Sequence, residues 1–308
     1  MAGVSDRPFR LLCQAQGAGL VFHEMISSKP ELRQTSKSQQ RRVRRDDPEP
    51  RAVQLLGNEP EVLAAAARQA VADGAQIIDL NMGCPAKKVC RKAAGSALMA
   101  EPDLVADLLN AVVRAVDVPV SLKIRTGVDA EQINAVTIAQ IAEQAGVCLL
   151  SIHGRHRAQR YEGTAEYDTI AAVVDAVEIP VLANGDIDSV PKARFVLEHT
   201  QAAGIMVGRA ALGQPWLFAQ LRAGLTGQPL PPKPDTAAII ALLQQQLQQI
   251  HQHYGEYSGV RIARKHWKWY SNHLMTDDAA GFNRLQTAFE QQQWLSGLLN
   301  KAYQEDAD

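Results

Sequence analysis

The chain has 308 residues, of which 46% are hydrophobic and 21% charged, and its net charge at pH 7 is −1. This composition is typical of a soluble globular enzyme, and a chain of this length forms one large domain, or one large and one small domain. No apolar run reaches the roughly 20 residues that span a membrane, and no signal peptide opens the chain. We therefore expect a cytoplasmic protein.

Cysteine spacing and charge limit the kinds of site that the chain can contain. The cysteines, Cys13, Cys84, Cys90 and Cys148, have neither CxxC nor zinc-ligand spacing, so we expect reduced thiols. Because the net charge is close to zero, any contact with nucleic acid must come from local basic patches. Two patches are present, one formed by Arg41, Arg42, Arg44 and Arg45 and the other by Arg261, Arg264, Lys265 and Lys268.

Short apolar or β-branched runs alternate with Ala-rich amphipathic segments between residue 17 and about residue 215. The apolar runs predict strands over residues 20–24, 51–56, 76–80, 118–124, 148–153, 179–183 and 205–207. The amphipathic segments predict helices that include residues 61–73, 103–116, 131–145, 168–177 and 190–198. Such an alternation is typical of a parallel sheet with helices on its outside, and it predicts an α/β protein of the (β/α)8 or TIM-barrel type.

The predicted strands number seven, whereas a closed barrel of this type needs eight. A helix start signal, Ser5-Asp6-Arg7-Pro8, follows almost directly on Met1, so the missing strand is the first one. We expect a truncated or wrongly assigned start, because an open sheet edge would expose unpaired backbone groups.

The pattern changes after residue 215. A Gly- and Pro-rich stretch over residues 224–234 predicts a linker, and helical patterns follow over residues 236–254, 259–274 and 283–303. We therefore expect a barrel domain over residues 1–223, the linker over 224–234 and a small helical domain over 235–308.

Polar and reactive residues gather at the ends of the predicted strands, where barrels of this type carry their active sites. Gln54 lies near one strand end, and Asn81-Met82-Gly83-Cys84-Pro85 follows the next. The later strands end in Lys123-Ile124-Arg125, His153-Gly154-Arg155, Asn184-Gly185-Asp186 and Gly208-Arg209. This clustering predicts a site at one rim of the barrel.

The last two loops fit a phosphate site, which this fold often places after its seventh and eighth strands. Gly185 and Gly208 would let backbone N–H groups approach an anion, and Arg209 could clamp it with its fork of donors. The alternative is that the glycines only form tight turns.

Four other rim residues have a functional and a structural interpretation each. Lys123 could form a buried salt bridge or face an electron-rich cofactor ring. Gln54 could bind the edge of a pyrimidine or flavin ring, or satisfy backbone groups. His153 could be a structural histidine or could bind a substrate or cofactor oxygen. Cys84 lies in the rim loop, so we favour a reactive role over that of a small buried hydrophobe. Walker A and Rossmann glycine fingerprints are absent, so a nicotinamide reductant would use the same mouth as the substrate.

Taken together, these motifs resemble one family. Met1-Ala2-Gly3-Val4-Ser5-Asp6-Arg7-Pro8, the Asn81–Pro85 loop with Lys87-Lys88-Val89 after it, and the four later strand ends occur in the order found in the bacterial tRNA-dihydrouridine synthases. The resemblance is greatest to the B subfamily and extends to the helical segment Arg261-Ile262-Ala263-Arg264-Lys265-His266. The family normally begins with a strand and a Pro before the Met, which are absent here.

The resemblance implies an enzyme that reduces the C5=C6 bond of a uridine in the tRNA D-loop to 5,6-dihydrouridine, with FMN as cofactor and NADPH or NADH as reductant. It implies that Cys84 is the general acid and that Asn81 lies beside the flavin and the target base. The implied FMN contacts are Met1, Ala2, Gln54, Lys123, His153, Asn184, Gly185, Asp186, Gly208 and Arg209.

The implied tRNA contacts in the tail are Arg261, Arg264, Lys265 and Lys268, which share one helical face through their i, i+3, i+4 and i+7 spacing. A solvated charged face is the structural alternative for them. Two rival functions also remain, a flavin dehydrogenase for a free pyrimidine and a non-catalytic tRNA-binding protein. We expect a monomer.

Overall fold

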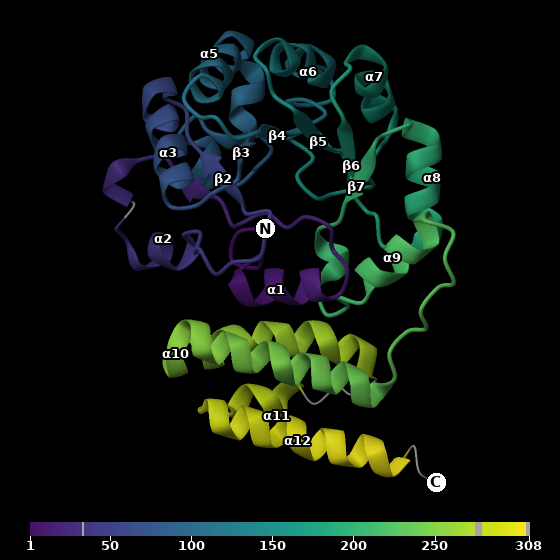
Figure 1. Ribbon diagram of the computed structural model, residues 1–308. Helices are drawn as coiled ribbons and strands as arrows, with labels where there is room; N and C mark the ends of the chain where they lie inside the picture. Colours follow the sequence, from purple (N-terminus) through teal and green to yellow (C-terminus); the bar gives the residue numbers. More distant parts are fainter. Residues whose placement is uncertain (33, 275–278, 306–308) are drawn as a thin grey trace. The chain divides into compact units, whose positions relative to one another are not determined.

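The computed structural model describes residues 1–32, 34–274 and 279–305. Its chain divides into two compact units (Figure 1). The first, called the barrel unit here, comprises Met1–Asp6 and Leu20–Gly208. The second, called the helical unit, comprises Arg7–Gly19 and Arg209–Asp308. Residues 209–223, which the sequence pattern places with the barrel, therefore group with the helical unit, as do residues 7–19.

A parallel sheet forms the centre of the barrel unit, with its strands side by side in chain order. The strands are β1 (Ile26–Ser27), β2 (Ala52–Leu56), β3 (Ile77–Asn81), β4 (Val120–Arg125), β5 (Leu149–His153), β6 (Val181–Asn184) and β7 (Gly204–Met206). Because strand order follows chain order and every pair is parallel, each connection must cross over on the outside.

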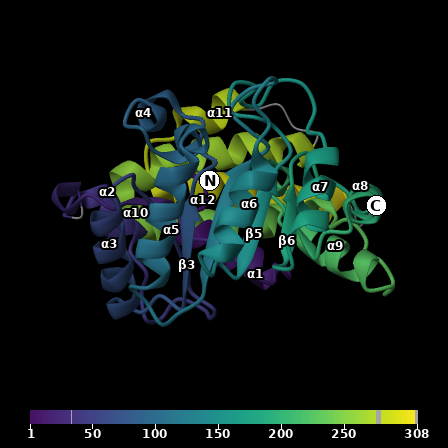
Figure 2. The same cartoon turned by 90° about the horizontal axis from the view of Figure 1, so that it is seen from above.

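Helices on the outside of this sheet supply those crossovers (Figure 1). In the view from above, the strands and the helices that follow them run alongside each other (Figure 2). The crossover helices are α3 (Pro60–Ala72), α5 (Pro102–Val113), α6 (Ala135–Gln144), α7 (Asp168–Ala176) and α8 (Val190–Thr200). Shorter elements lie in the loops: η1 (Pro30–Leu32), α2 (Ser36–Arg41), α4 (Lys87–Cys90) and η2 (Gly95–Ala100).

Local sequence explains where these helices begin. Pro60 and Pro102 occupy the first turns of α3 and α5, where a missing N–H costs nothing. The Ser189 side chain caps α8 by accepting the N–H of Lys192. The buried apolar faces of the helices then pack onto the strands, and the α/β barrel architecture predicted from the sequence is confirmed.

The strand predicted over residues 20–24 is wrong in its position. Phe22 bridges Ala52, whereas β1 begins at Ile26 and pairs Ile26 with Leu55. From the first pair to the second, one segment advances by four positions and β2 by three, so one residue is extra, as in a bulge. Among the described residues no further strand joins β7 to β1, as the count of seven predicted strands anticipated.

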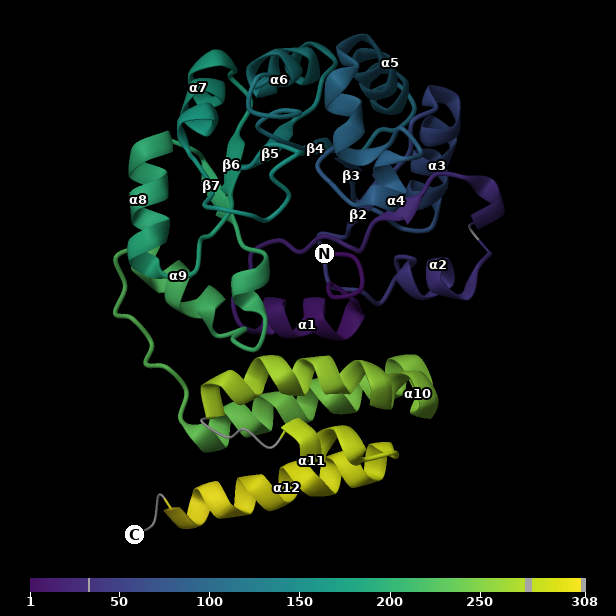
Figure 3. The ribbon, with the colours of Figure 1, turned by 180° about the vertical axis from the view of Figure 1, so that it is seen from behind.

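The helical unit consists of α1 (Arg7–Ala15), η3 (Arg209–Ala211), α9 (Leu217–Leu225), α10 (Thr236–Leu274), α11 (Ala279–Arg284) and α12 (Ala288–Glu305). α10 is two helices joined at Gly255, whose φ of 73° breaks the helical path. The two segments lie side by side, and α12 runs alongside them (Figures 1 and 3). Leu243, Trp267 and Phe282 belong to the buried core between them.

A buried polar cluster fixes the pairing of the two α10 segments. Gln246 bonds the ring of His266 at 3.0 Å and accepts the hydroxyl of Tyr270 at 3.0 Å. Near the turn, a Cβ on Gly259 would come within 2.9 Å of the Cα of His251, so a glycine is needed for this close approach. Since buried polar groups must be satisfied, these bonds favour one register of the hairpin.

Candidate active site

Strands β2, β3 and β4 bring Gln54, Asn81 and Lys123 close together near one rim of the barrel unit. Register pairs Gln54 with Asp79, and Asn81 with Lys123, on adjacent strands. Because side chains alternate along a strand, Asp79 and Asn81 share one face, and so do Ser121 and Lys123. The polar residues predicted for the rim therefore belong to one layered cluster.

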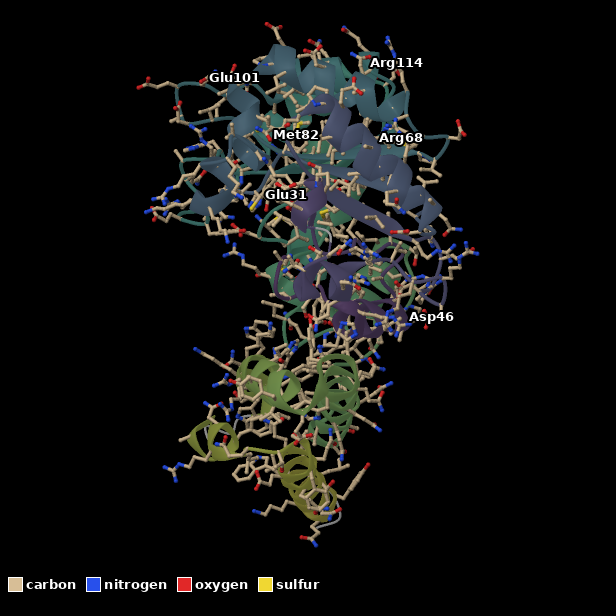
Figure 4. All side chains as sticks on the ribbon, turned by 90° about the vertical axis from the view of Figure 1, so that its left-hand side faces the viewer. Glu31, Asp46, Arg68, Met82, Glu101 and Arg114 are labelled. Carbon is tan, nitrogen blue, oxygen red and sulfur yellow. The ribbon has the colours of Figure 1, made fainter. Side chains whose placement is uncertain are left out.

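Asn81 connects this cluster to the loop that carries Cys84. Its Nδ2 donates to Oε1 of Gln54 at 2.7 Å. Its Oδ1 accepts the backbone N–H of Gly83 at 3.2 Å and that of Cys84 at 2.9 Å. Met82, the next residue, is buried within the barrel unit and is 1% exposed (Figure 4). The Asn81 amide thus sets the backbone of the loop just where the thiol is attached.

Further bonds hold the Cys84 loop from its other side. The carbonyl of Cys84 accepts the N–H of Ser96 at 3.1 Å and its hydroxyl at 2.9 Å, and the Cys90 thiol approaches it at 3.6 Å. Gly95 has a φ of +63°, and a Cβ there would come within 2.8 Å of the same carbonyl oxygen. Cys90 and Ser96 were not singled out by the sequence, because their role depends on the fold of the loop.

The Cys84 side chain is half-buried. Burial is the largest influence on it and raises the pKa of the thiol above its ordinary value of 9.0. A raised pKa keeps the sulfur protonated at neutral pH. Cys84 is therefore suited to donating a proton rather than to attacking as a thiolate.

Lys123 and Asp79 bring two ionisable groups of opposite charge into the interior of the barrel unit. Burial lowers the pKa of Lys123 to about 7, against the opposing effect of Asp79. Burial raises the pKa of Asp79 to about 6, although bonds from Ser121 and Gln54 and the charge of Lys123 oppose this. The Lys123 amine donates to the carbonyl of Ile124 at 3.4 Å. It can therefore change protonation near neutral pH, which an exposed lysine cannot do.

Arg125, predicted only as part of the Lys123-Ile124-Arg125 motif, holds two loops of the rim together. Its side chain is 1% exposed, and its Nε donates to the carbonyl of Gly83 at 2.8 Å. One terminal nitrogen donates to the carbonyls of His156 and Arg160 at 3.1 and 2.8 Å. Arg125 therefore ties the Cys84 loop to the loop that follows β5. Its place at the end of a predicted strand was the available signal, and a buried arginine there must find several acceptors.

The loop after β6 is held by an ion pair. Both carboxylate oxygens of Asp186 accept from the guanidinium of Arg155, at 2.9 and 2.6 Å. Arg155 is 2% exposed and also donates to the carbonyls of Glu162 and Gly163. The donors of Arg155 are therefore used inside the protein.

Asn184 and the two glycines of the predicted phosphate site lie in this part of the barrel unit. Asn184 donates to the carbonyl of Met206, which joins the ends of β6 and β7. Gly185 has a φ of +127°, and a Cβ there would meet Ala165 at 2.7 Å. A Cβ on Gly208 would meet nothing nearer than the sulfur of Met1, at 3.8 Å. Gly185 is thus required by packing, whereas Gly208 leaves space at the rim.

His153 is held neutral at the end of β5. Burial is the largest cause, and with the charges of Lys123, Arg125 and Arg155 it lowers the pKa of His153 to about 2. Its Nε2 lies 3.2 Å from a guanidinium nitrogen of Arg155. A neutral imidazole beside a fixed cation acts as a hydrogen-bonding group rather than as an acid in the neutral range.

The first residues of the chain are anchored to the bulge before β1. Met1 and Ala2 are exposed. The N–H of Gly3 donates to the carboxylate of Glu24, which pairs with Arg41 at 3.0 Å. Arg41 is therefore engaged within the barrel unit and does not simply extend the basic patch of residues 41–45.

The four basic residues predicted to bind tRNA lie on the second segment of α10 in the helical unit. Arg261 and Lys268 are exposed, and Arg261 lies over the ring of Tyr257 at 4.5 Å. Arg264 is half-buried and donates to the carbonyl of Leu285 at 3.0 Å, whereas the Lys265 amine lies 5.9 Å from the ring centre of Trp269. The face therefore divides into two residues directed to solvent and two packed against the protein. Arg209, the exposed first residue of η3, also belongs to this unit.

The described residues contain neither a membrane-spanning helix nor a metal site. Over residues 1–32, 34–274 and 279–305, no helix has the length and apolar character needed to cross a membrane. Within the same ranges, histidines, cysteines and carboxylates do not gather into a group that could hold a metal ion.

Comparison with known proteins identifies relatives along almost the whole chain. The model of the dihydrouridine synthase (Dus) family matches residues 1–307. tRNA-dihydrouridine synthase B of Pseudomonas aeruginosa is 54% identical over 93% of this chain and 87% of its own length. The proteins of the same name from Yersinia pestis and Vibrio cholerae are 53% and 50% identical, over 94% and 97% of this chain and 91% and 94% of their own lengths.

A solved structure, histamine dehydrogenase from Rhizobium sp. 4-9, overlaps with a TM-score of 0.47 at 11% identity, over 80% of this chain and 46% of that chain. That overlap is too weak to bear on function. The family match and the relatives, by contrast, cover the barrel unit together with the helical unit. The chain belongs to the dihydrouridine synthase family.

Proposed function

We propose that this protein is an FMN-dependent tRNA-dihydrouridine synthase that reduces the C5=C6 bond of a D-loop uridine to 5,6-dihydrouridine, with NADPH or NADH as the reductant. The observation that carries the proposal is the Cys84 loop. A protonated thiol, fixed by Asn81 at the rim of the barrel unit, occurs in a chain 54% identical to a tRNA-dihydrouridine synthase B.

The residues of the rim fit a flavin mononucleotide. Lys123 is a buried amine with donors beyond its one long bond of 3.4 Å, and a flavin ring offers nitrogen and oxygen acceptors. Gln54, Met1 and Ala2 are the further proposed contacts of the ring. The FMN phosphate would be held by backbone groups of Asn184, Gly185, Asp186 and Gly208, by the Arg209 side chain that follows Gly208 in the chain, and by neutral His153.

FMN, when bound, supplies a hydride to C6 of the uracil ring. Cys84 then donates its proton to C5, which completes the saturation of the C5=C6 bond. The burial that raises the pKa of Cys84 keeps this proton in place until it is needed. Asn81 serves the same step because it orients the Cys84 backbone and can bind the base. Lys123, whose pKa lies near neutrality, supplies positive charge that can balance negative charge at the cofactor.

A uridine inside folded tRNA must leave its stack before it can enter a barrel mouth, which costs a few kcal/mol. Contacts between tRNA phosphates and Arg261 and Lys268 would offset this cost, because both side chains are exposed. Arg264 and Lys265 would support that face mainly by packing. We propose a monomer that acts in the cytoplasm, where its tRNA substrate is found.

An absorption spectrum of the purified protein tests this function. The expected result is a visible flavin spectrum that NADPH bleaches and that unmodified tRNA restores. Replacing tRNA with free uridine distinguishes this function from that of a dehydrogenase for free pyrimidines. The reduced flavin of such a dehydrogenase would be reoxidised by free uridine as well. A colourless protein that also fails to bind added FMN would contradict the reductase and leave RNA binding alone.

A further inference from the structure

A buried carboxylate lies one layer below the proposed catalytic residues and takes no part in the steps above. Asp79 of β3 is 1% exposed. Its Oδ1 accepts the hydroxyl of Ser121 at 2.6 Å, and its Oδ2 accepts the side-chain amide of Gln54 at 2.6 Å. Both oxygens are therefore used by neighbouring strands, β4 on one side and β2 on the other.

These bonds fix which end of each side-chain amide in the cluster faces which neighbour. An ionised carboxylate can only accept, so the NH2 group of Gln54 must face Asp79 and its Oε1 must face Asn81. Asn81 then presents its NH2 group to Gln54 and its Oδ1 to the N–H groups of Gly83 and Cys84. Because the two ends of an amide have nearly the same shape, the charge on Asp79 at one end and the two backbone N–H groups at the other together select this orientation over the reverse one.

The reverse orientation would be harmful at the loop. If Asn81 turned over, its NH2 group would confront two backbone N–H groups, and the loop that carries Cys84 would lose its acceptor. This orientation requires a charged Asp79, and burial without a close ion pair disfavours the charged form of a carboxylate. The charged side chain that acts on Asp79 is Lys123 of β4, which itself faces Arg125, and its attraction only partly offsets the burial.

We infer that Asp79 is a positioning residue for the proposed reaction, which fixes the Cys84 loop through Gln54 and Asn81. The inference rests on the proposed function, because it assumes that the Cys84 thiol acts on the uracil ring. Asp79 touches none of the reacting atoms; it acts by setting the direction of two amides.

The test separates the two half-reactions in three FMN-loaded variants, Asp79→Asn, Gln54→Leu and the double variant. Asp79→Asn keeps the shape but can face Gln54 with either an oxygen or an NH2 group. We expect it to slow flavin reoxidation by tRNA about tenfold, since small misplacements of a catalytic group cost this much or more. Flavin reduction by NADPH should stay within about twofold of the unmodified protein, because Cys84 is not needed there.

The double variant tests the route. If Asp79 acts through Gln54, then Asp79→Asn should add less than about twofold to the effect of Gln54→Leu, because the connection is already broken. As a matched control, Asp47→Asn removes another buried carboxylate of the barrel unit, one that binds His23 and the N–H of Arg44. It should leave the ratio of the two half-reactions unchanged.

A readout without turnover is the backbone amide signal of Cys84 in protein labelled with ¹⁵N at cysteine, assigned by its loss in Cys84→Ser. In Asp79→Asn it should move upfield and exchange faster with solvent, as its bond to Asn81 weakens. The inference is overturned if this signal stays in place, if both half-reactions fall together, or if the two substitutions act independently. An unmodified protein whose reduced flavin ignores tRNA would instead contradict the proposed function itself.

Discussion

The side-chain oxygen of Asn81 accepts the backbone N–H of Cys84 at 2.9 Å. Through this bond, the residue proposed to lie beside the base also fixes the residue proposed to protonate it. The same amide donates to Gln54 at 2.7 Å, so three proposed contacts of cofactor and substrate share one hydrogen-bonded chain. Substitutions along this chain should therefore affect the tRNA half-reaction before they affect the fold.

Replacing the thiol tests its role as the acid. Cys84→Ala should slow flavin reoxidation by tRNA by about 10²–10⁴-fold, the usual contribution of a general acid. Flavin binding, tRNA binding and reduction by NADPH should persist, as stopped-flow absorbance and a gel-shift assay would measure. In the unmodified protein the tRNA step should slow only at alkaline pH, above the ordinary thiol value of 9.0, because burial raises the pKa of Cys84.

The exposed Cys148 provides the control for this experiment. The Cys148 thiol donates to the carbonyl of Val120, and Cys148→Ser keeps a donor there. This variant should behave like the unmodified protein. A Cys84→Ala protein that still reduces tRNA at the normal rate would assign the proton to another group.

Gly95 offers a test of the loop backbone. In Gly95→Ala the new Cβ would lie within 2.8 Å of the Cys84 carbonyl oxygen and of a Val89 methyl group, at a φ of +63°. We expect the strained φ to cost about 1–2 kcal/mol and the contact to add about 1–3 kcal/mol of unfolding free energy. Activity with tRNA should fall as well, because the thiol moves with the loop.

Gly227 is a matched control, since its φ is +71° and a Cβ there would meet nothing within 4 Å. Gly227→Ala should show the φ cost alone. Thermal unfolding followed by circular dichroism compares the two. Equal losses in both variants would mean that the Gly95 loop can move aside.

Asp79 should make stability depend on pH in the acidic range. Its folded pKa of about 6 lies above the ordinary 3.8, so the folded protein binds the proton more tightly than the unfolded chain does. Its contribution to stability is then full below pH 3.8 and is lost as the pH rises through about 6.

The difference between the two pKa values corresponds to about 3 kcal/mol. The Asp79→Asn variant lacks this titration. As the pH rises from 4 to 6.5, the unmodified protein should therefore lose up to this amount of unfolding free energy relative to the variant. Urea unfolding at several pH values measures it. A constant difference across the range would place the Asp79 pKa in its ordinary range.

The basic face of α10 should contribute to tRNA affinity unequally. Arg261→Ala and Lys268→Ala should each weaken binding and lower the slope of log affinity against log salt by about 1, as expected when one phosphate contact is lost. Arg264→Ala should act mainly by lowering the melting temperature, because its guanidinium is half-buried and bonded to Leu285.

The control is Arg68, an exposed arginine on α3 that is labelled in Figure 4. Arg68→Ala should leave the slope unchanged. Fluorescence anisotropy of labelled tRNA at several salt concentrations gives these slopes. Equal effects of Arg68 and Arg261 would indicate general attraction to charge instead of a defined face.

Residue pattern alone predicted much of this molecule. Alternation of apolar runs and amphipathic segments gave the order of strands and helices, because period and turn residues are local properties of the chain. Strand-end motifs placed Asn81, Cys84 and Lys123 at one rim, since parallel strands bring their carboxyl ends to the same edge. The position of the first strand was wrong, because a bulge between Phe22 and Ile26 depends on pairing with β2 and leaves no local signal.

Only the tertiary structure decided what each rim residue does. Arg155 and Asp186 are separated by 31 positions, and nothing local shows that they neutralise each other. Asp79 looked like one more residue in a buried strand until its neighbours from β2 and β4 were in place. Sequence fixes which groups are available and their local geometry, whereas partners, burial and protonation depend on contacts between distant strands and loops, which only the packed fold brings together.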